Sequence, residues 1–125
     1  MKALTYFGKG VTSGDFNGDG TKEFFAGAPG YSELGIPDKG GVFKVDFTSD
    51  SNQAAPKPYL TLKEQFTRFG FSMTTVDFDH DGIDDLVVSA PAEGPGGPAD
   101  IHDYYTKSYY GAVYVYLGKK GVGIE

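Results

Sequence analysis

The 125-residue sequence contains no cysteine and no tryptophan, and it has few basic residues. Without cysteine, the chain can form neither disulfides nor a thiolate metal site. Its 11 Lys and Arg residues against 17 Asp and Glu residues give a net charge of −6. This charge argues against nucleic-acid binding, because contacts to the phosphate backbone need a basic surface. No apolar run approaches the length of a membrane span, so we expect no membrane insertion.

What the sequence has in abundance is turn formers and aromatic residues. It holds 19 glycines and 7 prolines, and 15% of its residues are aromatic. No segment shows a sustained helical period. This composition is typical of a turn-rich, all-β protein.

The chain also repeats itself. Phe-Gly at 7–8 recurs at 69–70, the acidic segment 15–23 recurs at 77–85, and Gly-Ala-Pro at 27–29 recurs as Ser-Ala-Pro at 89–91, all at an offset of 62. The segment 41–45 then matches 111–115 at an offset of 70, which implies eight extra residues in the second copy. We therefore divide the chain into two units, 1–62 and 63–125.

Each unit is expected to form one propeller blade of four antiparallel strands. Short β-rich runs precede and follow each acidic segment, a third run follows at 41–45 or 111–117, and 58–63 is the expected fourth strand of the first unit. A set of phenylalanines is expected to form the core between the blades: Phe7, Phe16, Phe24, Phe69, Phe71 and Phe78. Two blades cannot close a ring. Other copies of the chain, or the remaining part of a longer chain, must complete it.

The duplicated acidic loop carries the strongest chemical signal. Oxygen-bearing side chains fall at loop positions 1, 3, 5 and 9, with glycine at position 6, where the backbone reverses. The carbonyl of position 7 can face the same centre. The expected ligands are Asp15, Asn17, Asp19, Thr21 and Glu23 in the first loop, and Asp77, Asp79, Asp81, Ile83 and Asp85 in the second.

This oxygen-only set favours Ca²⁺, which takes six to eight oxygen ligands, and we expect two ions per chain. Zn²⁺ would prefer His or Cys, which these positions lack. An EF-hand would need Glu at position 12, where the sequence has Ala26 or Val88. The alternative is a plain Asp/Asn/Gly turn capped by its own side chains. The four carboxylates of the second loop predict tighter binding there, whereas Asp84, at position 8, is expected to face outward.

These landmarks resemble the FG-GAP repeat, the blade unit of the β-propeller in integrin alpha subunits and in glycosylphosphatidylinositol-specific phospholipase D. The resemblance covers nearly the whole chain. Glu23 in place of the usual Asp and Ser89 in place of Gly are departures from the family pattern. The resemblance implies metal sites on one rim, ligands on the opposite rim, and an extracellular or cell-surface location, although the sequence after Met1 does not read as a signal peptide.

The segment 92–110 would belong to that opposite rim and is rich in tyrosine. Its candidate ligand-binding residues are His102, Tyr104, Tyr105, Tyr109 and Tyr110. Clustered tyrosines suit an interface, but they can equally cover the chain's own blades.

Three functions fit these observations. The first is a non-enzymatic, calcium-binding propeller module that binds a protein or a cell-surface ligand, as in adhesion. The second is a non-catalytic propeller part of a phospholipase-type enzyme. The third is a self-assembling, lectin-like ring that binds glycans. No Ser/His/Asp or Cys/His grouping indicates catalysis in this chain.

Overall fold

The computed structural model describes residues 5–33, 35–45, 57–63, 66–92 and 111–124. Over these ranges the chain forms six strands and no helix, so none that could cross a membrane. The strands are β1 (Gly10–Gly14), β2 (Glu23–Ala28), β3 (Gly41–Val45), β4 (Met73–Val76), β5 (Asp85–Ala90) and β6 (Ala112–Tyr116). The expected all-β class is confirmed.

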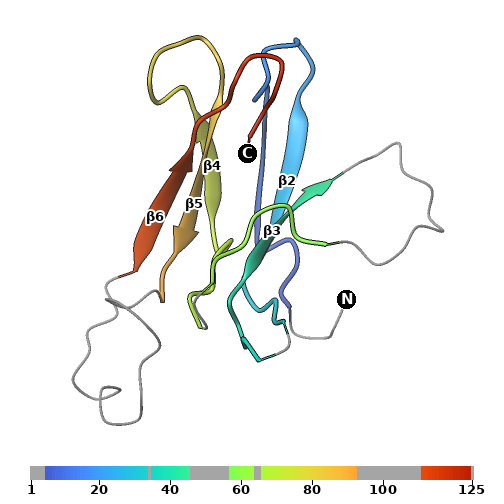
Figure 1. The fold of residues 1–125 in the computed structure, drawn as a ribbon, viewed down its shortest axis with the longest axis vertical. Helices are drawn as coiled ribbons and strands as arrows, with labels where there is room; N and C mark the ends of the chain where they lie inside the picture. Colours follow the sequence, from blue (N-terminus) through green and yellow to red (C-terminus); the bar gives the residue numbers. More distant parts are fainter. Residues whose placement is uncertain (1–4, 34, 46–56, 64–65, 93–110, 125) are drawn as a thin grey trace, which may run out of the picture.

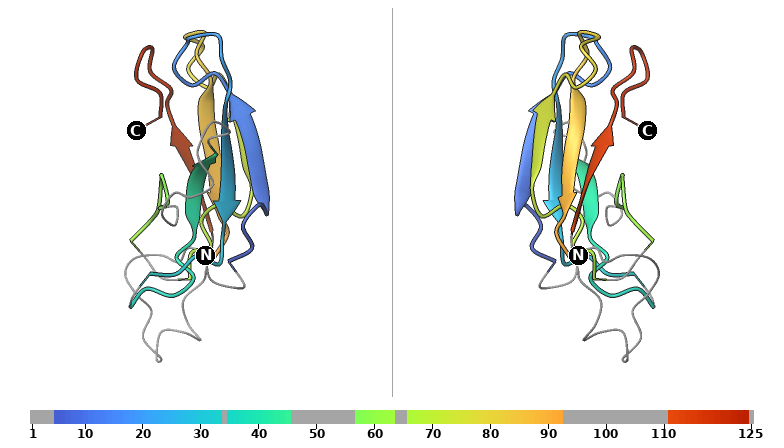
Figure 2. Two further views of the ribbon diagram at one scale, coloured as in Figure 1. Left: turned by 90° about the vertical axis from the view of Figure 1, so that its right-hand side faces the viewer. Right: turned by 90° about the vertical axis from the view of Figure 1, so that its left-hand side faces the viewer.

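The strands form two antiparallel sheets, ordered β1-β2-β3 and β4-β5-β6 (Figure 1). Each sheet lies within one of the two predicted units, although the unit boundary near residue 62 itself stays a prediction. The sheets stack face to face, with β1 beside β4 (Figure 2). Two blades packed in this way leave the ring open.

The fourth strand expected at 58–63 does not form. Leu60 makes only an isolated bridge to Val42, in which the Val42 carbonyl accepts hydrogen bonds from the backbone N–H groups of both Tyr59 and Leu60. Pro58 has no N–H to extend a ladder. Each sheet therefore has three strands among the described residues.

The residue offset between β3 and β6, the third strands of the two sheets, differs from the offset of 70 in the sequence match. Ala28 pairs with Gly41 in the first sheet, and Ala90 pairs with Ala112 in the second. Gly41 thus corresponds to Ala112, at an offset of 71 rather than 70, so the second unit carries nine extra residues. The left-handed glycines just before each strand agree, with φ of +78° at Gly40 and +76° at Gly111.

The core fills the space between the two sheets. Its buried members are Phe16, Phe25, Val42, Phe69, Leu86, Val88, Ala90 and Ile124. Phe69 is fully buried and makes edge-to-face contacts with Tyr114 and Tyr116. Of the six phenylalanines expected in the core, only Phe16 and Phe69 are buried. Phe7, Phe24, Phe71 and Phe78 are between 38% and 62% exposed.

Glycines at the junction between the two sheets let their backbones come into direct contact. A Cβ added to Gly27 would lie 2.0 Å from the Gly70 carbonyl oxygen, and one added to Gly40 would lie 2.2 Å from that of Phe69. Across the same junction the Thr12 and Thr75 hydroxyls are 2.7 Å apart. The blades are therefore joined by backbone packing and hydrogen bonds as well as by apolar side chains.

Candidate metal sites

The two acidic loops are the hairpin turns β1–β2 and β4–β5, and both lie at the same end of the molecule, at the top of Figure 1. Position 6 of each loop is a left-handed glycine, with φ of +86° at Gly20 and +87° at Gly82. Position 4 is also left-handed, at Gly18 and His80. The shared backbone conformation places equivalent side chains in equivalent positions.

The first residue of each loop stabilises the turn. Asp15 Oδ1 and Oδ2 accept hydrogen bonds from the N–H groups of Asp19 and Gly20, at 3.1 and 2.8 Å. In the second loop Asp77 accepts the corresponding bonds from Asp81 and Gly82 at the same distances. Both loops therefore contain the same two hydrogen bonds, so they repeat in structure as well as in sequence.

The turn bonds also shift the pKa values of these two acids. The Gly20 N–H holds the pKa of Asp15 below its usual range. Burial works to raise the pKa of Asp77, but the N–H groups of Gly82 and Asp81 outweigh it and lower the pKa. Both acids are therefore held as carboxylates.

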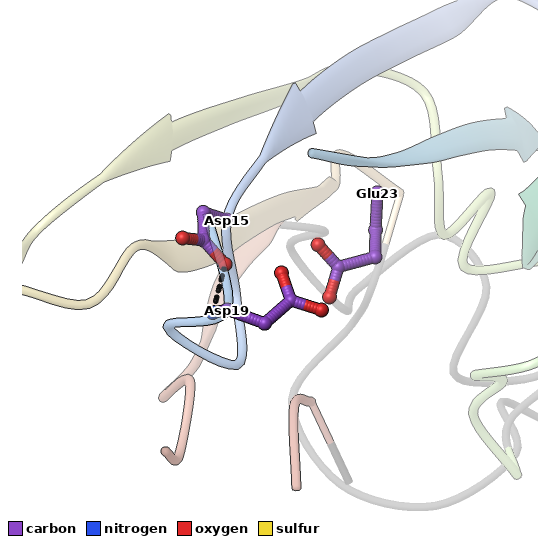
Figure 3. A group of neighbouring side chains, drawn as sticks. All are labelled: Asp15, Asp19 and Glu23. Carbon is purple, nitrogen blue, oxygen red and sulfur yellow. Dashed lines mark hydrogen bonds between the residues drawn. The ribbon is translucent and has the colours of Figure 1, made fainter. Parts of the chain in front are cut away.

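In the first loop, carboxylate oxygens of Asp15, Asp19 and Glu23 lie within 4.8 Å of one another (Figure 3). Asn17 is beside them, and its Oδ1 accepts the Asp19 N–H at 3.1 Å. Desolvation and the charge of Asp19 raise the pKa of Glu23. Glu23 Oε2 is buried and has no hydrogen-bond partner. An orphaned acidic oxygen among other carboxylates fits a bound cation, and a self-capped turn does not account for it.

In the second loop the acids brought together are Asp77, Asp79 and Asp85. Desolvation and the charges of Asp81 and Asp85 raise the pKa of Asp79. Asp85 is fully buried, and its two oxygens accept the N–H groups of Gly118 and Phe78 at 2.8 and 2.7 Å. Asp81 is not among these three acids. Its Oδ1 accepts the Ile83 N–H at 2.9 Å, as Asp19 Oδ1 accepts the Thr21 N–H at 2.8 Å in the first loop. The ligand roles of all ten expected residues stay predictions.

Asp84 has a role that the sequence did not reveal. Its Oδ2 accepts the Asp15 N–H at 2.9 Å, and its own N–H donates to the Asp15 carbonyl at 3.2 Å. This two-way bridge joins the first residue of one acidic loop to the eighth residue of the other. Asp84 lies outside the carboxylate group of its own loop, in keeping with its expected outward position, and contacts the neighbouring loop.

The predicted tyrosine-rich ligand site falls outside the described residues. His102, Tyr104, Tyr105, Tyr109 and Tyr110 all lie in 93–110, so their ligand-binding role stays a prediction.

Comparison with known proteins identifies the family. The FG-GAP repeat model matches residues 7–43 and 69–116, more than half of the chain. The chain therefore belongs to the FG-GAP repeat family, as the sequence resemblance predicts.

Curated relatives extend this result. Phosphatidylinositol-glycan-specific phospholipase D from Dictyostelium discoideum is 30% identical over 131 residues, covering 93% of this chain and 13% of the relative. The Homo sapiens protein of the same name is 33% identical over 128 residues, covering 94% and 14%. Integrin alpha-4 from Xenopus laevis is 34% identical over 124 residues, covering 97% and 11%. The chain thus spans only between about a ninth and a seventh of the length of these relatives, and the matched region is the repeat.

Proposed function

We propose that this chain is a non-catalytic, calcium-binding pair of propeller blades that binds a protein ligand as part of a larger ring. The observation that carries the metal assignment is the paired acidic groups at one end of the fold, with the buried Glu23 Oε2 left without a partner. Hard oxygen donors on a tight loop suit Ca²⁺. Two ions per chain would change the formal charge from −6 to −2.

The outer face of the second blade supports the partner assignment. Val42 is 0% exposed, but its counterpart Val113 is 66% exposed, and Val115 on the same face is 39% exposed. The second blade thus exposes the face whose counterpart in the first blade is buried against its neighbour. A further blade, from a longer chain or from another copy, would cover this face. An extracellular or cell-surface setting belongs to this proposal, since free Ca²⁺ there fills even weak sites.

A second candidate is the non-catalytic propeller part of a phospholipase-type enzyme. The similarity to phosphatidylinositol-glycan-specific phospholipase D over nearly all of this chain favours it. The two candidates share the metal sites and differ in what else the parent protein contains. Sequencing the full transcript distinguishes them, because a catalytic domain in the same reading frame would support the second.

Calorimetric titration with Ca²⁺ tests the metal assignment, with Mg²⁺ as the competing ion. We expect two Ca²⁺ per chain, and one in each of Glu23→Gln and Asp79→Asn. Neither of these side chains makes the hydrogen bonds of Asp15 and Asp77 that stabilise the turns, so far-UV circular dichroism should be unchanged. Asp38→Asn, which removes a carboxylate outside the loops, is the matched control. Two ions bound by all three variants would refute the assignment.

A further inference from the structure

A cavity of about 410 Å³ lies between the two blades, away from the acidic loops. Its lining comes from the entry to β1, the end of β2, the β2–β3 connection and the approach to β4. The principal side chains are Tyr6, Lys9, Pro29, Asp38, Arg68 and Phe71. The volume falls within the range of small-ligand sites, roughly 300 to 1,000 Å³.

The cavity wall is built from strained backbone. Tyr6, Asp38 and Arg68 have φ of 57°, 48° and 58°, a region that side-chained residues seldom adopt. Backbone hydrogen bonds hold them there, with the Lys9 N–H donating to the Tyr6 carbonyl at 3.0 Å and the Arg68 N–H to the Asp38 carbonyl at 3.2 Å. Such strain gathers at functional sites, where the surrounding structure fixes it.

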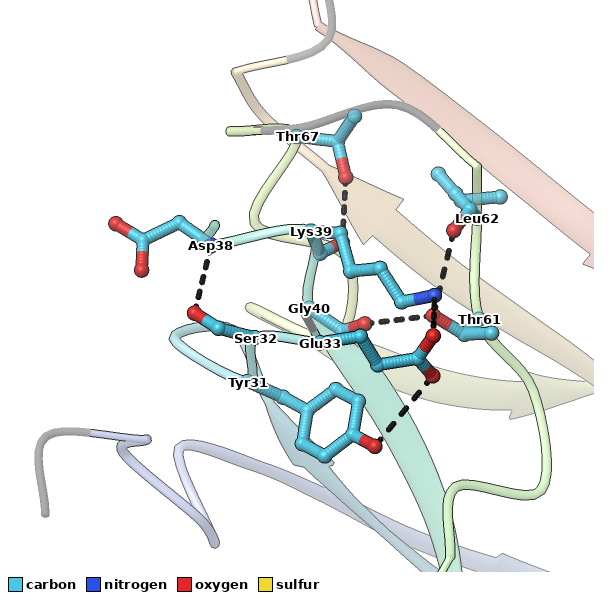
Figure 4. Close-up of polar contacts among 9 residues, drawn as sticks. All are labelled: Tyr31, Ser32, Glu33, Asp38, Lys39, Gly40, Thr61, Leu62 and Thr67. Carbon is cyan, nitrogen blue, oxygen red and sulfur yellow. Dashed lines mark hydrogen bonds and ion pairs between the residues drawn. The ribbon is translucent and has the colours of Figure 1, made fainter. Parts of the chain in front are cut away.

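The β2–β3 connection that carries Asp38 is fixed from its other side (Figure 4). The buried Lys39 forms an ion pair with Glu33 at 2.8 Å, and the Thr67 hydroxyl donates to the Lys39 carbonyl at 2.7 Å. The Asp38 carboxylate lies apart from this ion pair in Figure 4. The cavity wall is therefore preorganised, which lowers the entropic cost of binding.

The cavity carries a positive charge on a chain of net −6. Lys9 and Arg68 face one acid, Asp38, and within the described ranges neither cation forms an ion pair. Lys9 Nζ lies 5.0 Å from the centroid of the Phe71 ring, which fixes its position above that ring. The planar Arg68 guanidinium can bind a carboxylate through two parallel hydrogen bonds. The preferred ligand is therefore an anion.

The aromatic side chains narrow the choice of anion. Tyr6 is 62% and Phe71 38% exposed, and together with Arg68 they form the residue combination that is enriched at protein interfaces. Lys9 already covers one face of the Phe71 ring, so a sugar ring stacked on that face would have to displace it. These features favour an acidic peptide over a glycan.

We propose that this cavity binds the side-chain carboxylate of an acidic peptide segment, with Arg68 and Lys9 as the recognition residues. The inference rests on the proposed role in ligand binding and names the chemical class of the ligand. It does not depend on either metal site, because no residue of the acidic loops lines the cavity.

Two-dimensional ¹H–¹⁵N NMR titration of the full chain tests this site with the blocked peptide acetyl-Ala-Glu-Ala-amide. The peptide acetyl-Ala-Gln-Ala-amide is the neutral control, and glucuronic acid tests the glycan alternative. Every titration is run with calcium and with chelator. We expect saturable shifts at residues 6, 9, 68 and 71 with the Glu peptide, and a dissociation constant at least tenfold weaker with the Gln peptide.

Arg68→Gln and Lys9→Gln should each weaken binding of the Glu peptide at least tenfold. The matched control is Lys44→Gln, which removes an exposed lysine that also lies over an aromatic ring, 5.8 Å from the centroid of Tyr59. This control should change the dissociation constant less than twofold. Equal binding of the Glu and Gln peptides, shifts elsewhere, or tighter binding of glucuronic acid than of the Glu peptide would overturn the proposal. Such a result beside an intact two-site calcium titration would leave the proposed metal function standing.

Discussion

Gly27→Ala tests the closest contact between the two blades. A Cβ at this position would lie 2.0 Å from the Gly70 carbonyl oxygen, 2.8 Å from its carbonyl carbon and 2.9 Å from its Cα. Contacts under 3.0 Å are essentially absent from real structures, so the two backbones would have to separate by roughly 1 Å. The obstruction is backbone on both sides, so no side-chain rotation can relieve it.

The expected cost lies at the upper end of the overpacking range, about 3 kcal/mol in the free energy of unfolding. For a chain of this size, that corresponds to a fall in the melting temperature of roughly 10 °C. Thermal and urea unfolding followed by circular dichroism measure both quantities. The change acts through contact alone, because Gly27 is not among the glycines with positive φ.

Gly41→Ala is the matched control for this prediction. An added Cβ there would meet only side chains, the nearest being Pro58 at 3.2 Å, and the corresponding residue of the second blade is already Ala112. We expect a change within about 1 kcal/mol, with a small gain possible because the unfolded chain loses freedom. Equal stability of Gly27→Ala and the wild type would refute the close packing of the blades described here.

Three further changes test other parts of the fold. Phe69→Ala should lower the free energy of unfolding by about 3 to 5 kcal/mol in urea titrations, because it empties the fully buried centre of the core; a loss under 1 kcal/mol would contradict that placement. Asp84→Ala should cost about 1 to 3 kcal/mol in the same assay by leaving the Asp15 N–H without its acceptor, whereas Asp84→Asn, which keeps an acceptor oxygen, should cost less. Burial and the Glu33 charge raise the pKa of Tyr31 above 10.0, so its contribution to stability is complete below that pH and is lost as the pH rises through the raised value. Tyr31→Phe should therefore flatten the fall in the free energy of unfolding at alkaline pH. An unchanged pH profile of stability would contradict this prediction.

The sequence predicted the features that depend on local chemistry. Gly20 and Gly82 mark the backbone reversals because only glycine adopts their φ without strain, and both are left-handed in the structure. The β-rich runs on either side of each acidic loop became paired strands for the same local reason. Two copies of each signal made the repeat recognisable without an alignment.

Features that depend on contacts between distant residues could not be predicted in this way. The offset of 71 became visible only from the pairing of β2 with β3 and of β5 with β6, because a one-residue shift hardly alters so short a motif match. The pattern of a single loop predicts only that Asp84 faces outward. It cannot reveal that the neighbouring loop supplies the Asp15 N–H, which donates to the Asp84 carboxylate. The cavity around Arg68 likewise joins two units that the sequence presents separately.

The packing of the two blades gives a structural consequence to one departure from the family pattern, the serine at position 89. Ser89 is the counterpart of Gly27, and its Oγ accepts the Ser72 N–H at 3.0 Å on the uncovered side of the second blade. A blade packed onto that side with the geometry of the internal junction would bring its own backbone to within about 2 Å of the Ser89 Cβ, as Gly70 approaches Gly27. The next blade must therefore approach less closely there than the second blade approaches the first.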